Sequence, residues 1–193
     1  MEKFDNQEFK VSKWVNSTFL GWLLGFILIL VLSVGLDSIG IEGVQFFTGT
    51  GMGAGVGFMQ WRLNRRTIIK DKKWIWFSAL GLTIPFLFYD LLNLFSNYTL
   101  GAYLLPLCTG LGGIIVGLFQ FRMLNEISRK PKLWILASTI GWFFAVLTVS
   151  GMEYTNHITT NNMAGFTINI FLILGGGIVL GIITGMFLRK ILK

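Results

Sequence analysis

Six stretches of the sequence are predominantly apolar and have no charged residue near their centres. They lie at 17–36, 43–61, 74–90, 99–121, 133–151 and 164–188. A helix needs about 20 apolar residues to cross the hydrocarbon core of a bilayer. A charge at its centre costs about 2.5–3.5 kcal/mol even on an insertion scale. We therefore predict an all-α membrane protein with six transmembrane helices, forming a single integral membrane domain over residues 1–193.

The basic residues predict how these helices are oriented. All 16 Lys and Arg residues fall in the N-terminal tail, in 62–73, in 122–132 and in the C-terminal tail. The segments expected on the other side have acidic charges only, at Asp37, Glu42 and Glu153. Cytoplasmic loops are enriched in Lys and Arg, so both termini are expected in the cytoplasm, with the protein in the plasma (inner) membrane. The net charge of +7 is then a topology signal, and nucleic acid is not an expected partner.

A spacing of 60 residues indicates internal repetition. Trp14, Trp74 and Trp134 are each followed by a hydroxyl residue four positions on and by a glycine seven positions on. We predict three tandem two-helix repeats at about 14–62, 74–122 and 134–190. Because each repeat has an even number of spans, the repeats should be related by a pseudo-threefold axis along the membrane normal. The glycine-rich helices are expected innermost, and the three tryptophans are expected to be aromatic anchors at the membrane interface.

Small residues recur at spacing four in the second helix of each repeat. In a bilayer such stripes let helix backbones approach closely. The alternative is a flexible or pore-lining backbone. The predicted packing residues are Gly49, Gly53 and Gly57, then Gly113 and Gly117 after Thr109, and then Gly177, Gly181 and Gly185.

Four polar residues in or near the predicted spans are candidates for substrate contacts. Gln60 and Gln120 end their glycine stripes and could either join helices or form a polar ring around a solute, although the third repeat has Leu188 there. Asp90 is expected near the outer interface, where it could be solvated or functional. Asn169 is expected to bond to a neighbouring helix.

No pattern of an enzyme is present in the sequence. It has no His-Glu-x-x-His motif, no phosphate-binding loop and no pair of intramembrane carboxylates. The single His157 and single Cys108 offer no metal-ligand set. We therefore expect no catalytic residues, no metal and no cofactor.

One family resemblance rests on the glycine-glutamine motif. Gly53, Gly57, Gln60 and Trp61 are followed after a basic loop by Trp74. This pattern resembles a set of small bacterial multi-pass membrane proteins of unknown function with a repeated helical hairpin. In size and topology the chain is also similar to the substrate-binding subunits of energy-coupling-factor transporters. The first resemblance implies no activity, and the second implies binding of a small solute.

Two functions remain open from the sequence. The first is a non-enzymatic scaffold or membrane-complex subunit that packs against a membrane-protein partner or a second copy of itself, with the lipid bilayer around it. The alternative is a small-solute transporter or a transporter's substrate-binding subunit. A polar cavity at mid-membrane would favour transport, and a dry, glycine-packed centre would favour the scaffold.

Overall fold

The computed structural model describes residues 9–96, 100–128 and 130–192, without the side chain of residue 156. Its described residues form helices and connecting turns, with no strand among them. The prediction of an all-helical protein is confirmed, and each predicted helix has a counterpart whose ends differ by a few residues. The six long helices are α1 (Val11–Ser38), α2 (Phe46–Asn64), α3 (Lys73–Ser96), α4 (Leu104–Leu124), α5 (Lys132–Ser150) and α7 (Asn162–Ile191). The shorter elements are η1 (Gly101–Tyr103), η2 (Gly151–Tyr154) and α6 (Thr155–Ile158).

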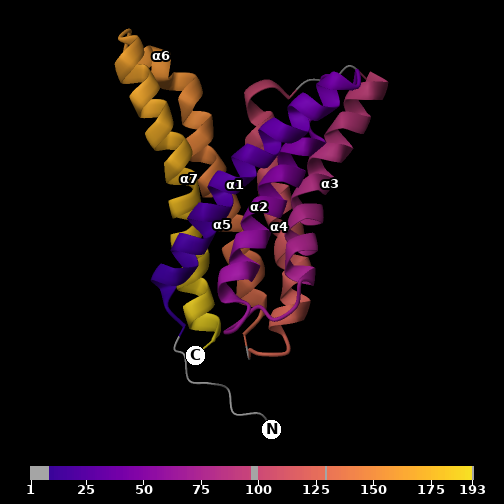
Figure 1. Ribbon diagram of the computed structural model, residues 1–193, viewed down its shortest axis with the longest axis vertical. Coiled ribbons are helices and arrows are strands. Elements are labelled where there is room, and N and C mark those ends of the chain that lie inside the picture. The colour runs from indigo at the N-terminus through magenta and orange to yellow at the C-terminus, as the bar shows by residue number, and fades with distance from the viewer. Residues whose placement is uncertain (1–8, 97–99, 129, 193) are drawn as a thin grey trace.

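The long helices form a closed ring in chain order. Each packs against the helix before it and the helix after it, and α7 returns to pack against α1. The start of α1, the end of α7 and the α2–α3 and α4–α5 connections lie at one end of the bundle, called here the terminal end (Figure 1). The opposite end is called the distal end. Glycine-rich helices therefore alternate with tryptophan-bearing ones, and the expectation that the glycine-rich helices are innermost is wrong: among the described residues, each packs chiefly against its two ring neighbours.

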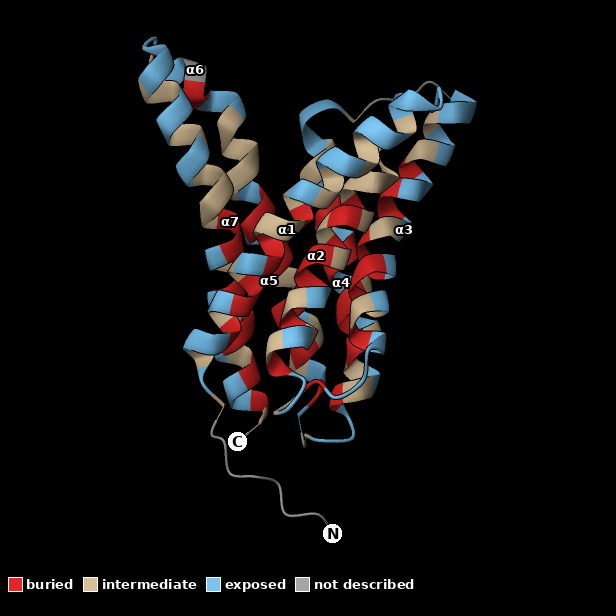
Figure 2. Cartoon of the chain, in the orientation of Figure 1, coloured by how far each residue is buried: buried red, intermediate tan, exposed pale blue. Residues whose placement is uncertain are grey.

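Apolar side chains fill the centre of the ring. Its middle layer takes at least one buried side chain from every long helix: Trp22, Val56, Leu82, Val116, Trp142, Ala145 and Leu180. A second cluster lies toward the terminal end and includes three further tryptophans. A smaller one joins α3 to α4 through Phe86, Tyr89 and Cys108. Figure 2 shows the buried residues concentrated in the middle and terminal parts, whereas the distal ends of the helices are mostly exposed or half-buried.

The outside of the bundle is strongly apolar. Large hydrophobic side chains such as Leu30, Phe88, Phe95 and Phe171 are exposed. Exposed apolar surface on this scale is typical of a membrane contact. Five of the long helices are long and apolar enough to cross a membrane by length and composition. The exception is α2, because glycine replaces larger apolar residues along much of its length.

Candidate functional site

Trp14, Trp74 and Trp134 meet inside the ring near its terminal end. They come from α1, α3 and α5 and are 0%, 1% and 2% exposed. Their ring centroids lie 5.6 to 6.2 Å apart, and Trp14 meets both partners edge to face. We call them the indole triad. This position corrects the interpretation of these residues as interface anchors, because an anchor must lie on the outside to reach headgroups. Trp76, which is 65% exposed on α3, is better placed for that role.

Each of the two glutamines joins three helices. The Gln60 amide nitrogen donates to Thr18 Oγ1 on α1 at 3.0 Å, and its carbonyl oxygen accepts from Trp74 Nε1 on α3 at 3.0 Å. Gln120 repeats the arrangement one helix pair later, donating to Ser78 Oγ and accepting from Trp134 Nε1, both at 2.8 Å. Both side chains are buried. The polar atoms of both side chains therefore form bonds between helices.

The third helix pair has no glutamine at the position equivalent to Gln60 and Gln120. Leu188 stands where the other two helix pairs have glutamine, and it is fully buried. Trp14 Nε1 donates instead to Thr184 Oγ1 at 2.9 Å, one turn earlier on α7. Ser138, which corresponds to Thr18 and Ser78, has a buried hydroxyl with no hydrogen-bond partner in the described part of the chain. The hydrogen bonds thus satisfy all three indoles but leave one hydroxyl unpaired.

This difference predicts unequal effects of two matched substitutions. Ser78→Ala should lower the free energy of unfolding by about 1 kcal/mol, because it removes the acceptor of a buried Gln120 amide. Ser138→Ala should leave stability unchanged or slightly raise it, because no bond is lost there. Reversible unfolding in mixed micelles with increasing SDS would measure both. Equal losses for the two variants would contradict the observed bonding.

The glycines of α2 bring its backbone against both neighbours. A Cβ added at Gly49 or Gly53 would collide with backbone atoms of α3, and one at Gly57 would lie 2.7 Å from the Ser78 side chain. Gly51 and Gly55 lie against α1 in the same way. None of these glycines therefore has room for a side chain.

The stripes of α4 and α7 each lie against the next tryptophan-bearing helix in the ring. A Cβ at Gly117 would lie 2.8 Å from Ile135 Cα on α5, and Gly113 faces the same helix. On α7 the predicted glycines face α1. Added Cβ atoms there would lie 2.7 Å from Trp22 Cβ for Gly177, 2.9 Å from Val15 Cα for Gly181 and 3.1 Å from the Trp14 ring for Gly185.

Asp90 and Asn169 make intramolecular bonds. The Asp90 carboxylate on α3 accepts from the backbone N–H of Gln45 at 2.8 and 2.9 Å and from that of Phe46 at 2.8 Å. It therefore caps the N-terminus of α2, where a negative charge is favoured by the unpaired N–H groups and the helix dipole. Asn169 Oδ1 accepts from the hydroxyl of Thr155 at 2.6 Å and so ties α7 to α6.

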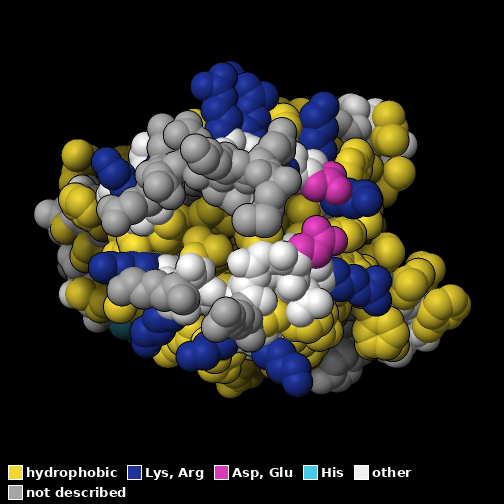
Figure 3. Space-filling model, turned by 90° about the horizontal axis from the view of Figure 1, so that it is seen from below, with side chains coloured by type: hydrophobic (Ala, Val, Ile, Leu, Met, Phe, Trp, Pro, Cys, Tyr) yellow, Lys and Arg dark blue, Asp and Glu magenta, His cyan; other side chains and the backbone are white. Residues whose placement is uncertain are grey.

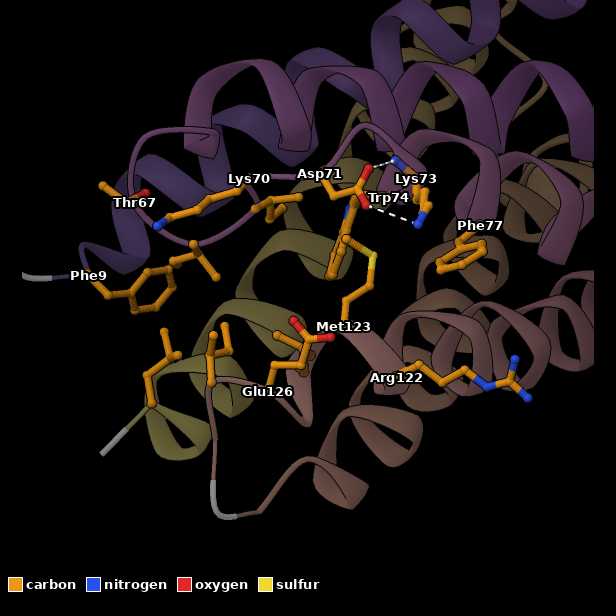
Figure 4. A pocket seen from close by; sticks show the side chains of 15 residues that line it. Phe9, Thr67, Lys70, Asp71, Lys73, Trp74, Phe77, Arg122, Met123 and Glu126 are labelled. Carbon is orange, nitrogen blue, oxygen red and sulfur yellow. Dashed lines mark hydrogen bonds and ion pairs between the residues drawn. The ribbon is translucent and has the colours of Figure 1, made fainter. Parts of the chain in front are cut away.

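A groove of about 960 Å³ opens at the terminal end, between the α2–α3 and α4–α5 connections. Its lining combines apolar side chains, among them Phe9, Trp74 and Phe77, with charged ones (Figure 4). We call it the terminal groove. Figure 3 shows Lys and Arg side chains around this end of the molecule and hydrophobic ones in the hollow between them. The charged lining residues are Lys70, Asp71, Lys73, Arg122 and Glu126.

A second, smaller cavity of about 280 Å³ lies in the distal half of the ring. We call it the distal cavity. Its lining comes from α1 to α5 and from Gln45 just before α2, and it is mostly aliphatic or aromatic. No charged side chain is among the described residues that line it.

Three residues that build this interior are not singled out by the sequence. Thr184 takes over the acceptor role for Trp14, and the only signal for it is that the first two repeats have valine there. Ile69, from the α2–α3 connection, is buried against the indole triad. Asn64 donates to Ser17 Oγ on α1 at 3.1 Å.

The described residues contain no group of three or more His, Cys, Asp or Glu side chains that could hold a metal ion. Comparison of the chain with protein-family models, with curated proteins and with solved structures finds no match. The candidate sites are therefore defined by the geometry of this chain.

Proposed function

We propose that the protein is a non-enzymatic, multi-pass integral membrane protein that works by contact with a protein partner at its terminal groove. In this proposal α2 is the sixth span and both termini lie in the cytoplasm. The helices form three tandem two-helix units around a pseudo-threefold axis. The partner is another membrane protein or a second copy of this chain.

The hydrogen bonds of the interior support the three-unit arrangement. Gln60 and Gln120 lie 60 residues apart and make the same pair of bonds to a hydroxyl and an indole. The third unit keeps the indole in place through Thr184. The glycines of α2 support its role as a span, because a helix packed closely between α1 and α3 needs fewer large apolar side chains facing lipid.

The observation that carries the functional proposal is the use of both glutamines between helices, beside the indole triad that fills the centre of the ring. The middle layer above the triad is apolar as well. A hydrophilic solute would meet mainly apolar side chains along this axis. The terminal groove, in contrast, has both apolar and charged lining residues, as protein-binding surfaces do.

Charge neutralisation in the two basic connections tests this proposal. The variant replaces Arg65, Arg66, Arg129 and Lys130 by glutamine; Arg129 lies outside the described residues. Six basic residues remain in 62–73 and 122–132, so insertion should be unchanged. A photo-crosslinking amino acid at Ile127, which lines the groove, should give a protein adduct in cells that the neutralised variant loses.

The matched control is Gln60→Leu with Gln120→Leu, which removes polar groups from the interior and leaves the terminal surface intact. It should lower stability and keep the adduct. A crosslinker at Phe95, exposed toward the distal end, should not give the same adduct. An adduct at Ile127 that persists after charge neutralisation would contradict contact through these charges.

Small-solute transport is the second candidate: the distal cavity provides space for a ligand, although its lining is mostly apolar. If the protein is a transporter, the substitutions described above should have the opposite effects on its activity. The basic connections would be dispensable, and the two glutamines would be essential for activity in a protein that still folds stably.

A further inference from the structure

We propose that the distal cavity holds one hydrocarbon chain of a membrane lipid, taken from the leaflet on the side opposite the chain termini. The inference rests on the membrane placement in the proposed function but not on the partner at the terminal groove. The ligand class is a single saturated or unsaturated lipid chain.

The lining of the cavity suits an apolar ligand. Phe26 and Ile29 come from α1, Val146 and Val149 from α5, and Trp22 and Trp142 belong to the apolar middle layer of the ring. The polar side chains that line it are Gln45, Thr48 and Thr109. Gln45 and Thr48 stand at the distal start of α2, the level at which a lipid's ester groups would lie. The cavity thus has a mostly apolar lining with polar residues at the start of α2. A lipid likewise has an apolar chain that ends in polar ester groups.

Helices α1 and α7 are exposed or half-buried along their distal halves. Beyond Gly25, α1 has no buried residue among those described as far as its end at Ser38. Likewise, α7 has no buried residue before Gly176. The distal halves of α1 and α7 diverge to opposite sides of the bundle (Figure 1), and no described residue of α7 lines the cavity. A chain from a neighbouring lipid could therefore enter between α1 and the α5–α7 pair.

The size and the apolar lining of the space favour hydrocarbon over water. Cavities lined by apolar side chains stay dry, whereas a buried water needs two to four polar partners. An empty cavity forfeits the dispersion contacts of its lining atoms. If a methylene takes about the volume of a water molecule, roughly 30 Å³, the cavity of about 280 Å³ holds on the order of nine methylenes. That is a substantial part of one lipid chain.

The charges at the distal end indicate which lipid headgroup the site would accept. Asp37 at the end of α1, Glu42 before α2 and Glu153 in η2 lie toward the distal end, where no Lys or Arg lies among the described residues. An anionic headgroup would therefore find no Lys or Arg partner among the described residues. The site is suited to a zwitterionic or uncharged lipid, recognised through its chain.

The test uses the full protein in nanodiscs of phosphatidylcholine that carries a diazirine near the middle of one chain. After illumination, peptide mass spectrometry locates the crosslinks. Labels are expected at Met52 and Val149, which line the cavity, as well as at Leu30 and Phe171 on the outside. Val146→Trp should fill the space and abolish the label at Met52.

Leu147→Trp is the matched control. Val146 is 5% exposed and lines the cavity, whereas Leu147 is 40% exposed on the same helix, so only the first change should block entry. Labels at Leu30 and Phe171 without labels at Met52 and Val149 in the unaltered protein would overturn the lipid site, whether or not the Val146 variant folds. A label at Met52 that survives in folded Val146→Trp would also overturn it. Absence of all four labels would overturn the membrane placement itself.

Discussion

Replacing Gly53 by leucine is expected to lower the free energy of unfolding by about 3 kcal/mol or more, near the upper end of overpacking effects. The reason is that a Cβ at this position would collide with the carbonyl oxygen of Ser78 and lie 2.8 Å from Ala79 Cα. Both are backbone atoms, which cannot turn away as a side chain can. Helices α2 and α3 would therefore have to separate along their whole contact.

Gly35→Leu is the matched control. Gly35 also lies within a long helix, but no atom lies within 4 Å of a Cβ built there. Gly101 is less suitable, because its φ of +53° would strain any side chain. Unfolding in mixed micelles should show a large loss for Gly53→Leu and none for Gly35→Leu. Similar stability of the two variants would mean that α2 does not pack against α3 through this glycine.

Trp74→Ala is expected to cost about 3–5 kcal/mol, the range for removing a large buried aromatic side chain. Trp74 contacts both other members of the indole triad, and its indole N–H donates to Gln60. The substitution would leave a cavity between three helices and an unpaired amide oxygen beside it.

Trp76→Ala provides the control two residues away on the same helix. Trp76 is 65% exposed and should contribute little to packing. The same unfolding assay should therefore separate the two variants clearly. If Trp76→Ala were the more damaging change, the indole triad would not be the centre of the bundle, and the interpretation of Trp74 as a surface anchor would regain support.

The helices could be predicted from the sequence because membrane spans have a required length and polarity. Whether Trp14, Trp74 and Trp134 face the interior of the bundle or the lipid could not be predicted from the sequence. Their positions along the chain place them near one end of their helices, but an interface anchor and a core residue have the same spacing at that depth. Which face of α1, α3 and α5 points inward depends on the closure of the ring, and closure requires contacts between α1 and α7 that no local pattern encodes.

The structural roles of the polar candidates could also be predicted only in part. Gln60 and Gln120 recur at one register, so a shared role could be predicted from the sequence, but their partners on two other helices could not. Asp90 could be placed near the distal end, whereas its bonds to the start of α2 depend on how the α1–α2 connection returns. The two cavities arise where helices and connections fail to fill space. Such gaps leave no mark in a single sequence.

Orientation is tested most directly by labelling single cysteines with a membrane-impermeant thiol reagent in intact cells. The background is Cys108→Ser, which removes the native thiol. Cysteines at Arg66 and Lys130, both exposed at the terminal end, should be protected until the membrane is permeabilised. Cysteines at Ser38 and Thr160, exposed at the distal end, should label at once. Labelling of Arg66 and Lys130 in intact cells, with Ser38 and Thr160 protected, would contradict the cytoplasmic placement of the terminal groove and with it the proposed site of partner contact.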